Sequence, residues 1–138
     1  MIPVLDVTKL VASTLKNDAT LQTLFGGTVV IEYSVVRDTT TFPCIIIDSD
    51  SSDTYFNGVA RNFSKCSFTI KVVNRLAGLR GVDDIASRID VVLTALAIGT
   101  QGSTTYYKFR REIVHTYNSM DEGILYSYIV QVYTNVGF

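Results

Sequence analysis

The chain has 138 residues, of which 18% are charged, and its formal net charge is −1. This length fits one domain around one hydrophobic core, covering residues 1–138. The near-neutral balance disfavours a protein that grips nucleic-acid phosphates, because such proteins normally carry a clear basic excess. No apolar stretch reaches membrane-spanning length and the first residues lack a basic signal-peptide start, so we expect a soluble protein made in the cytosol.

The low charge density and the aromatic content favour contact with other proteins. Typical domains are ~25% charged, whereas this chain combines 18% charge with eight Tyr and seven Phe. Tyr-rich surfaces that are poor in charge are common at protein interfaces. A large core beneath a neutral surface of Ser, Thr and Asn explains the composition equally well.

The N-terminal quarter predicts two helices. Asp6 can cap the first, and Asp18 can cap a second, short helix over 19–25 that Gly26-Gly27 would end. An approximate 3.6-residue period supports the first helix; its apolar members are Leu5, Leu10, Val11 and Leu15.

Three strands are predicted next, over 29–36, 44–48 and 63–73. The second is apolar on both faces, which is typical of a central strand covered twice. The third alternates apolar and polar residues, which predicts an antiparallel strand with one exposed face. Cys44 and Cys66 are too few for a disulfide framework or a zinc site, so each is interpreted as a small buried hydrophobe in a strand.

The C-terminal half predicts a long helix over 82–98, ended by Gly99, and two strands over 106–117 and 124–136 joined by a polar turn. The helix carries one apolar stripe and Asp83-Asp84 in its first turn. The predicted fold class is therefore α+β. We expect a mostly antiparallel sheet of about five strands, with a mixed sheet left open, on which the long helix and the N-terminal helical segment pack.

No catalytic, cofactor or metal site is predicted. His115 lies inside a strand without a nucleophile pattern nearby in sequence. Asp48, Asp50 and Asp53 resemble a calcium loop only in spacing, because Asp53 stands where that loop needs Gly and Val59 where it needs Glu. The basic and aromatic run 106–111 is interpreted as an edge or interface strand rather than a binder of single-stranded nucleic acid.

The order of these elements resembles the tail-terminator, or tail-completion, proteins of long-tailed bacteriophages. The matching stretches are DATLQTLFGG, TTFPCIIID, SFTIKVVNRLAGLRGVDDIASRIDVVLTAL and the final strands around MDEG. The resemblance covers nearly the whole chain, but it lies in the order of elements and the hydrophobic pattern. It implies a non-enzymatic virion protein whose homo-hexameric ring caps the tail tube, stops tube growth and joins the head.

The resemblance also implies partners and a location. These are the tail tube protein and a head-completion or neck protein, in the virion after assembly in the host cytoplasm, with DNA passing the lumen without specific binding. A long acidic loop expected over 49–58 is the predicted contact element, so that deleting 51–57 should spare folding and abolish tail joining. Its proposed contact residues are Asp50, Ser52, Asp53, Tyr55 and Phe56.

Three other functions stay open from the sequence. A neck or head-completion adaptor differs from a tail terminator only in the ring that it touches. A small enzyme would need a polar cleft, and a ligand-binding module could use the aromatic face of the last strands.

Overall fold

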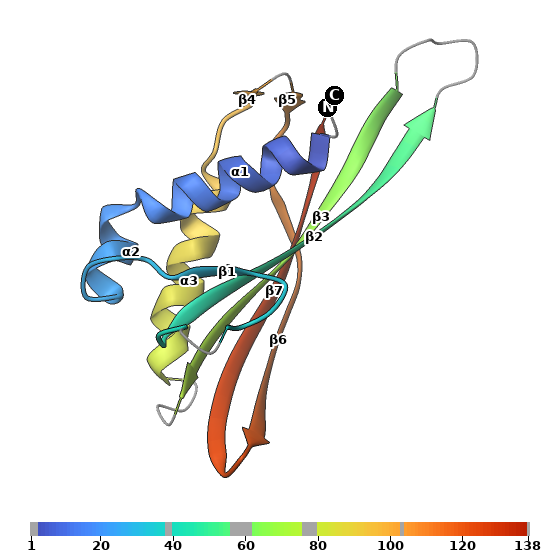
Figure 1. Cartoon of the computed structure of the whole chain (residues 1–138). Coiled ribbons are helices and arrows are strands. Elements are labelled where there is room, and N and C mark those ends of the chain that lie inside the picture. The colour runs from blue at the N-terminus through green and yellow to red at the C-terminus, as the bar shows by residue number, and fades with distance from the viewer. Residues whose placement is uncertain (1–2, 38–39, 56–61, 76–79, 103, 138) are drawn as a thin grey trace.

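The computed structural model describes residues 3–37, 40–55, 62–75, 80–102 and 104–137. Three helices and seven strands occur in these residues, and the strands form one sheet in the order β1-β2-β3-β7-β5-β4, with β6 also paired to β7 (Figure 1). In chain order the elements are α1 (Pro3–Lys16), α2 (Ala19–Leu24), β1 (Ile31–Tyr33), β2 (Cys44–Tyr55), β3 (Asn62–Arg75), α3 (Arg80–Thr94), β4 (Gly99–Gln101), β5 (Thr104–Tyr106), β6 (Arg110–Asp121) and β7 (Ile124–Gly137).

The α+β class is confirmed, and the sheet is mixed. Four long antiparallel strands, β2, β3, β7 and β6, make up most of it, and only the short β1 runs parallel to its neighbour β2. The two strands beyond the predicted five are β4 and β5, which are three residues each. The predicted strand over 106–117 is thus split, because residues 107–109 leave the ladder between β5 and β6.

Helices α1 and α3 cover one face of the sheet (Figure 1). The buried side of α1 is formed by Val7, Val11 and Leu15, all inaccessible to solvent, whereas Leu5 is 53% exposed. The predicted apolar face of the first helix was therefore wrong at Leu5. Asp6 does not cap α1, because the helix begins at Pro3 and places Asp6 in its first turn, where the side chain is buried.

The short helix α2 is fixed at both ends as predicted. The Asp18 carboxylate accepts a hydrogen bond from the Leu21 backbone N–H at 3.0 Å, which satisfies one of the free amides of the first turn. Gly26 follows the helix at φ 76°, a conformation that glycine adopts without steric cost. Asp18 also pairs with Arg88 of α3 through two bonds of 2.8 and 2.9 Å, which ties α2 to the main helix.

The prediction of a loop over 49–58 is wrong for its first seven residues. β2 continues to Tyr55, and residues 48–55 pair in register with β3 from Thr69 back to Asn62. Because the alternating strand β3 offers its backbone along this whole length, polar residues of weak strand propensity are held in the ladder. The two strands form an arm that extends beyond α1 (Figure 1).

The helix expected over 82–98 also has different ends, beginning at Arg80 and finishing at Thr94. Gly99 does not end the helix but begins β4. The apolar pattern suggested a longer helix because Leu96, beyond its end, still packs against the core.

The last hairpin turns more tightly than expected. β6 runs to Asp121, which pairs with Ile124, so the connection contains only Glu122 and Gly123. Both have positive φ, 49° and 79°, the combination that suits the twist of a two-residue hairpin turn. The hairpin β6–β7 forms a second arm, which points away from the β2–β3 arm (Figure 1).

Both cysteines are buried strand residues, as predicted, but on opposite faces. Cys66 belongs to the core beneath the helices, while Cys44 belongs to a smaller cluster on the other face with Ile46 and Val73. Burial raises the pKa of the Cys44 thiol to about 12. The predicted double coverage of residues 44–47 is confirmed. β2 is not central, however, since among the described strands β1 alone lies beyond it.

Candidate interaction surfaces

The strand β6 is solvent-exposed along its whole length. All twelve residues are exposed, and no strand among the described residues pairs with its outer edge. Half of a strand's backbone hydrogen-bonding groups point outward at such an edge, which makes it a template for pairing with another chain. The exposed apolar side chains on this β6 edge are Ile113, Val114, Tyr117 and Met120, between 38% and 69% accessible.

The residues just before β6 and at its start are basic. Lys108 and Arg110 are exposed, and Arg110 makes a 3.5 Å ion pair with Glu112 while 81% of its side chain stays accessible. Arg111 instead points toward α3, where it pairs with Asp90 at 3.2 Å. Arg110 is therefore the more available of the two guanidinium groups.

Asp90 also ties α3 to the sheet. It accepts a hydrogen bond of 3.2 Å from the Tyr133 hydroxyl, whose pKa is raised by burial and by this carboxylate. Gln131 donates to the Ala86 carbonyl at 3.2 Å. These bonds fix α3 over β7, while the part of β6 that follows Arg111 stays exposed.

The opposite edge of the sheet, formed by β1 and the residues after it, is also partly apolar. Tyr33, Val35 and Val36 are 51%, 68% and 41% exposed. We call residues 31–37 the β1 edge.

The β1 edge is held by a buried carboxylate. Glu32 receives two hydrogen bonds of 3.0 Å from the Arg37 guanidinium and one of 3.1 Å from Thr40. The Arg37 bonds hold the pKa of Glu32 below its usual value. Arg37 also donates its backbone N–H to the Thr40 hydroxyl at 2.9 Å, so the segment after β1 is closed on itself and presents its apolar residues outward.

Beyond the β1 edge, β2 carries acidic residues. β1 pairs only with residues 45–47, and no described strand pairs with the outer edge of residues 48–55. We call this stretch the acidic edge, because it contains Asp48, Asp50 and Asp53 and no basic residue.

The predicted contact residues are thus found on a strand rather than a loop. Asp50 lies in β2 and is exposed, and Ser52, Asp53 and Tyr55 follow on the same strand. Phe56 lies outside the described residues. Sequence reasoning missed the β1 edge, although the exposed pair Val35-Val36 beside the polar turn 37–41 was a signal for it.

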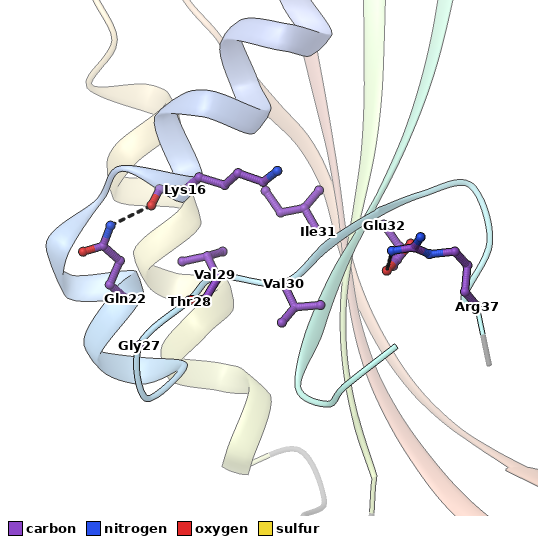
Figure 2. Close-up of a pocket in the computed structure, with 9 residues that line it drawn as sticks. All are labelled: Lys16, Gln22, Gly27, Thr28, Val29, Val30, Ile31, Glu32 and Arg37. Atoms are coloured by element: carbon purple, nitrogen blue, oxygen red, sulfur yellow. Dashed lines mark hydrogen bonds and ion pairs between the residues drawn. The ribbon is translucent and has the colours of Figure 1, made fainter. Parts of the chain in front are cut away.

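Several depressions lie on the surface of the described residues. The first, of 410 Å³, lies between α1, α2 and β1, where Gln22 donates to the Lys16 carbonyl at 2.8 Å (Figure 2). The carboxylate in this depression, Glu32, already accepts hydrogen bonds from Arg37 and Thr40. It is therefore not available to bind a ligand there.

The second depression, of 620 Å³, lies beside the β6–β7 turn. Tyr126 and Tyr128 line it, together with Arg75, whose guanidinium stacks on Phe42 at 4.4 Å. Tyr128 stacks in turn on Tyr117 of β6 with ring centroids 4.5 Å apart. The aromatic groups therefore pack against one another.

His115 lies within the β6 edge and stacks on Tyr117, with ring centroids 5.9 Å apart. In the part of the chain that the structure describes, no cluster of three His, Cys, Asp or Glu side chains could hold a metal ion. The described helices include none that is long and apolar enough to cross a membrane.

Comparison with known proteins supports the fold. No family model matches the sequence, and no curated protein matches it either. A chain in the solved structure of the virion of a native gene transfer agent particle is similar in fold, with a TM-score of 0.73 and 15% sequence identity. The alignment covers 93% of this chain and 92% of that chain, so the two share a fold over most of their length.

Proposed function

We propose that this protein is a structural subunit of a phage-like particle, and that copies of it form a closed ring that caps the tail tube. The ring ends tube polymerisation and presents a surface for joining the head. The observation that carries the proposal is the fold likeness to a chain of a gene transfer agent virion over 93% of the protein. The sequence resemblance to tail terminators points to the same class independently.

The arrangement of the surfaces supports an assembly role. Two arms project from the helix-covered body at opposite ends (Figure 1), and the sheet has a different exposed edge on each side. A subunit with two unlike surfaces can contact two neighbours head to tail, and such contacts generate a ring when the rotation closes. We propose that the ring contains six copies, because the family that this sequence resembles forms hexameric rings.

The partners follow from this role. They are further copies of the chain, the tail tube protein and a head-completion or neck protein, in the virion. DNA passes through the lumen without specific binding, which is consistent with a net charge of −1. The protein performs no catalysis in this proposal.

The test is to polymerise the tube protein of the same particle with and without this chain and to image the products by negative stain. We expect rings at one end of tubes and an arrest of further growth. Binding to a portal or neck assembly without any effect on tubes would instead establish the neck adaptor.

The β2–β3 arm needs a different test from the deletion of residues 51–57, because residues 51–55 are paired strand. Replacing residues 52–65 with Asn-Gly joins Ser51 directly to its cross-strand partner Cys66 and preserves the register. We expect this shortened variant to fold and to lose tail joining. Unchanged joining would exclude the arm as a partner contact.

A further inference from the structure

We propose that neighbouring copies meet through the two sides of the sheet, with the β6 edge of one copy lying antiparallel along the β1 edge of the next. Arg110 of the first copy then faces Asp50 of the second, on the acidic edge. This inference rests on the proposed ring and specifies its subunit contact.

The first support is that the two sides carry opposite charge at the same level of the sheet. The register connects one acidic and one basic residue across four strands: Asp50, Ser67, Thr134 and Arg110. A neighbour placed beside this sheet without reversal therefore brings its Arg110 to the level of Asp50. Further along the same two sides, Lys108 adds a positive charge beside Arg110, and Asp53 adds a negative charge beside Asp50.

The second support is that both sides of the sheet are apolar at one shared level, three residues before Asp50 along β2. A second row connects the exposed edges through buried strands: Tyr33, Ile47, Ile70, Gln131 and Val114. Tyr33 is 51% and Val114 is 46% exposed. Both lie on the helix side of the sheet, because Ile47 and Ile70 point into the core beneath the helices.

Strand direction fits the same arrangement. β2, β3, β7 and β6 alternate in direction, and β1 runs parallel to β2. In a head-to-tail repeat the next copy keeps its orientation, so β6 meets β1 antiparallel, and the sheet can continue from copy to copy. β1 stands one strand beyond β2, so the long side chain of Arg110 spans the step to the acidic edge.

A symmetric pairing of β6 with β6 is the main competing arrangement. It would close at two copies, use the β6 edge twice and leave the acidic edge and the β1 edge exposed. The head-to-tail contact covers the apolar residues of both sides at once and gives each basic group an acidic neighbour.

Disulfide trapping distinguishes the two arrangements. Tyr33→Cys and Val114→Cys are made as separate variants, and the native thiols interfere little because Cys44 and Cys66 are fully buried. Mixed and mildly oxidised at high concentration, they should give a heterodimer between position 33 and position 114. Leu24→Cys, exposed on α2, replaces Tyr33→Cys as the matched control and should not cross-link.

A charge exchange tests the ionic part of the contact. Arg110→Asp on the Val114→Cys copy should lower the cross-linking yield at least about tenfold, because it opposes like charges. Asp50→Arg on the Tyr33→Cys copy should restore it. Failure to restore would overturn the pairing of Arg110 with Asp50.

Cross-links only between two copies of Val114→Cys would overturn the head-to-tail arrangement in favour of the symmetric one. Capped tubes without any cross-link between positions 33 and 114 would exclude this subunit contact but support the proposed function. Cross-links between positions 33 and 114 in a protein that never binds tubes would support the contact but exclude the proposed function.

Discussion

Strands β6 and β7 are neighbours with similar apolar content and opposite burial. On the helix-covered face of β7, Ile129 and Tyr133 are at most 4% exposed, whereas Val114, on the same face of β6, is 46% exposed. The difference arises because α3 is anchored over β7 through Gln131 and Tyr133 and contacts β6 near its start, at Arg111. Apolar residues on a strand therefore mark a core only where a second layer covers them; elsewhere they mark a surface that another chain can cover.

The largest effect expected from this comparison is on the covered side. Phe68 is fully buried and packs on Phe109 with ring centroids 5.8 Å apart, so Phe68→Ala should lower the free energy of unfolding by about 3–5 kcal/mol. Val114→Ala on β6 should change it by no more than about 0.5 kcal/mol. Urea denaturation of both variants measures the contrast, and equal losses would mean that β6 is covered within the monomer.

The next effect tests the link between α2 and the main helix. Asp18→Ala removes the helix cap and the partner of Arg88, and should cost about 1–2 kcal/mol. Asp84→Ala, exposed on α3, is the matched control and should stay within about 0.5 kcal/mol. Equal stability of the two variants would contradict the structural role of Asp18.

A smaller effect of opposite sign is expected at the tip of the β6–β7 arm. Glu122 adopts φ 49°, which is costly for most side chains and tolerated by Asn. Glu122→Asn should therefore raise the free energy of unfolding, by up to about 1 kcal/mol. A loss of stability would mean that the turn differs from the one described.

Acid should reveal the carboxylate that holds the β1 edge. The pKa of Glu32 is lowered, first by the Arg37 hydrogen bonds, from an ordinary value of 4.5. Its contribution is thus complete above pH 4.5 and is lost as the pH falls through the lowered folded value. Thermal unfolding between pH 7 and pH 3 should show a shallower acid slope for Glu32→Gln than for the wild type, and identical slopes would exclude this contribution.

Several features of the fold were predictable because their causes are local. The cap at Asp18, the glycine at 26 and the alternation along β3 each depend on a few neighbouring residues, and each is confirmed. The stripe on α3 is confirmed for the same reason: Ile85, Ile89 and Leu93 are all buried.

The errors concern features decided by distant residues. Residues 49–55 have the composition of a loop, yet β3 holds them in a ladder. The sequence pattern placed Tyr106 and Phe109 in one strand, but the strand is interrupted at residues 107–109. Both side chains are buried in the core. The alignment of Asp50 with Arg110 depends on the register of four strands, so no local pattern could have predicted it.

Imaging of tubes that are polymerised in the presence of this protein decides whether it forms a ring that caps the tail tube. We expect tubes that carry one ring at one end and stop growing, whether or not the isolated protein forms rings. Tubes that keep bare ends and continue to grow at saturating protein would show that it does not cap them.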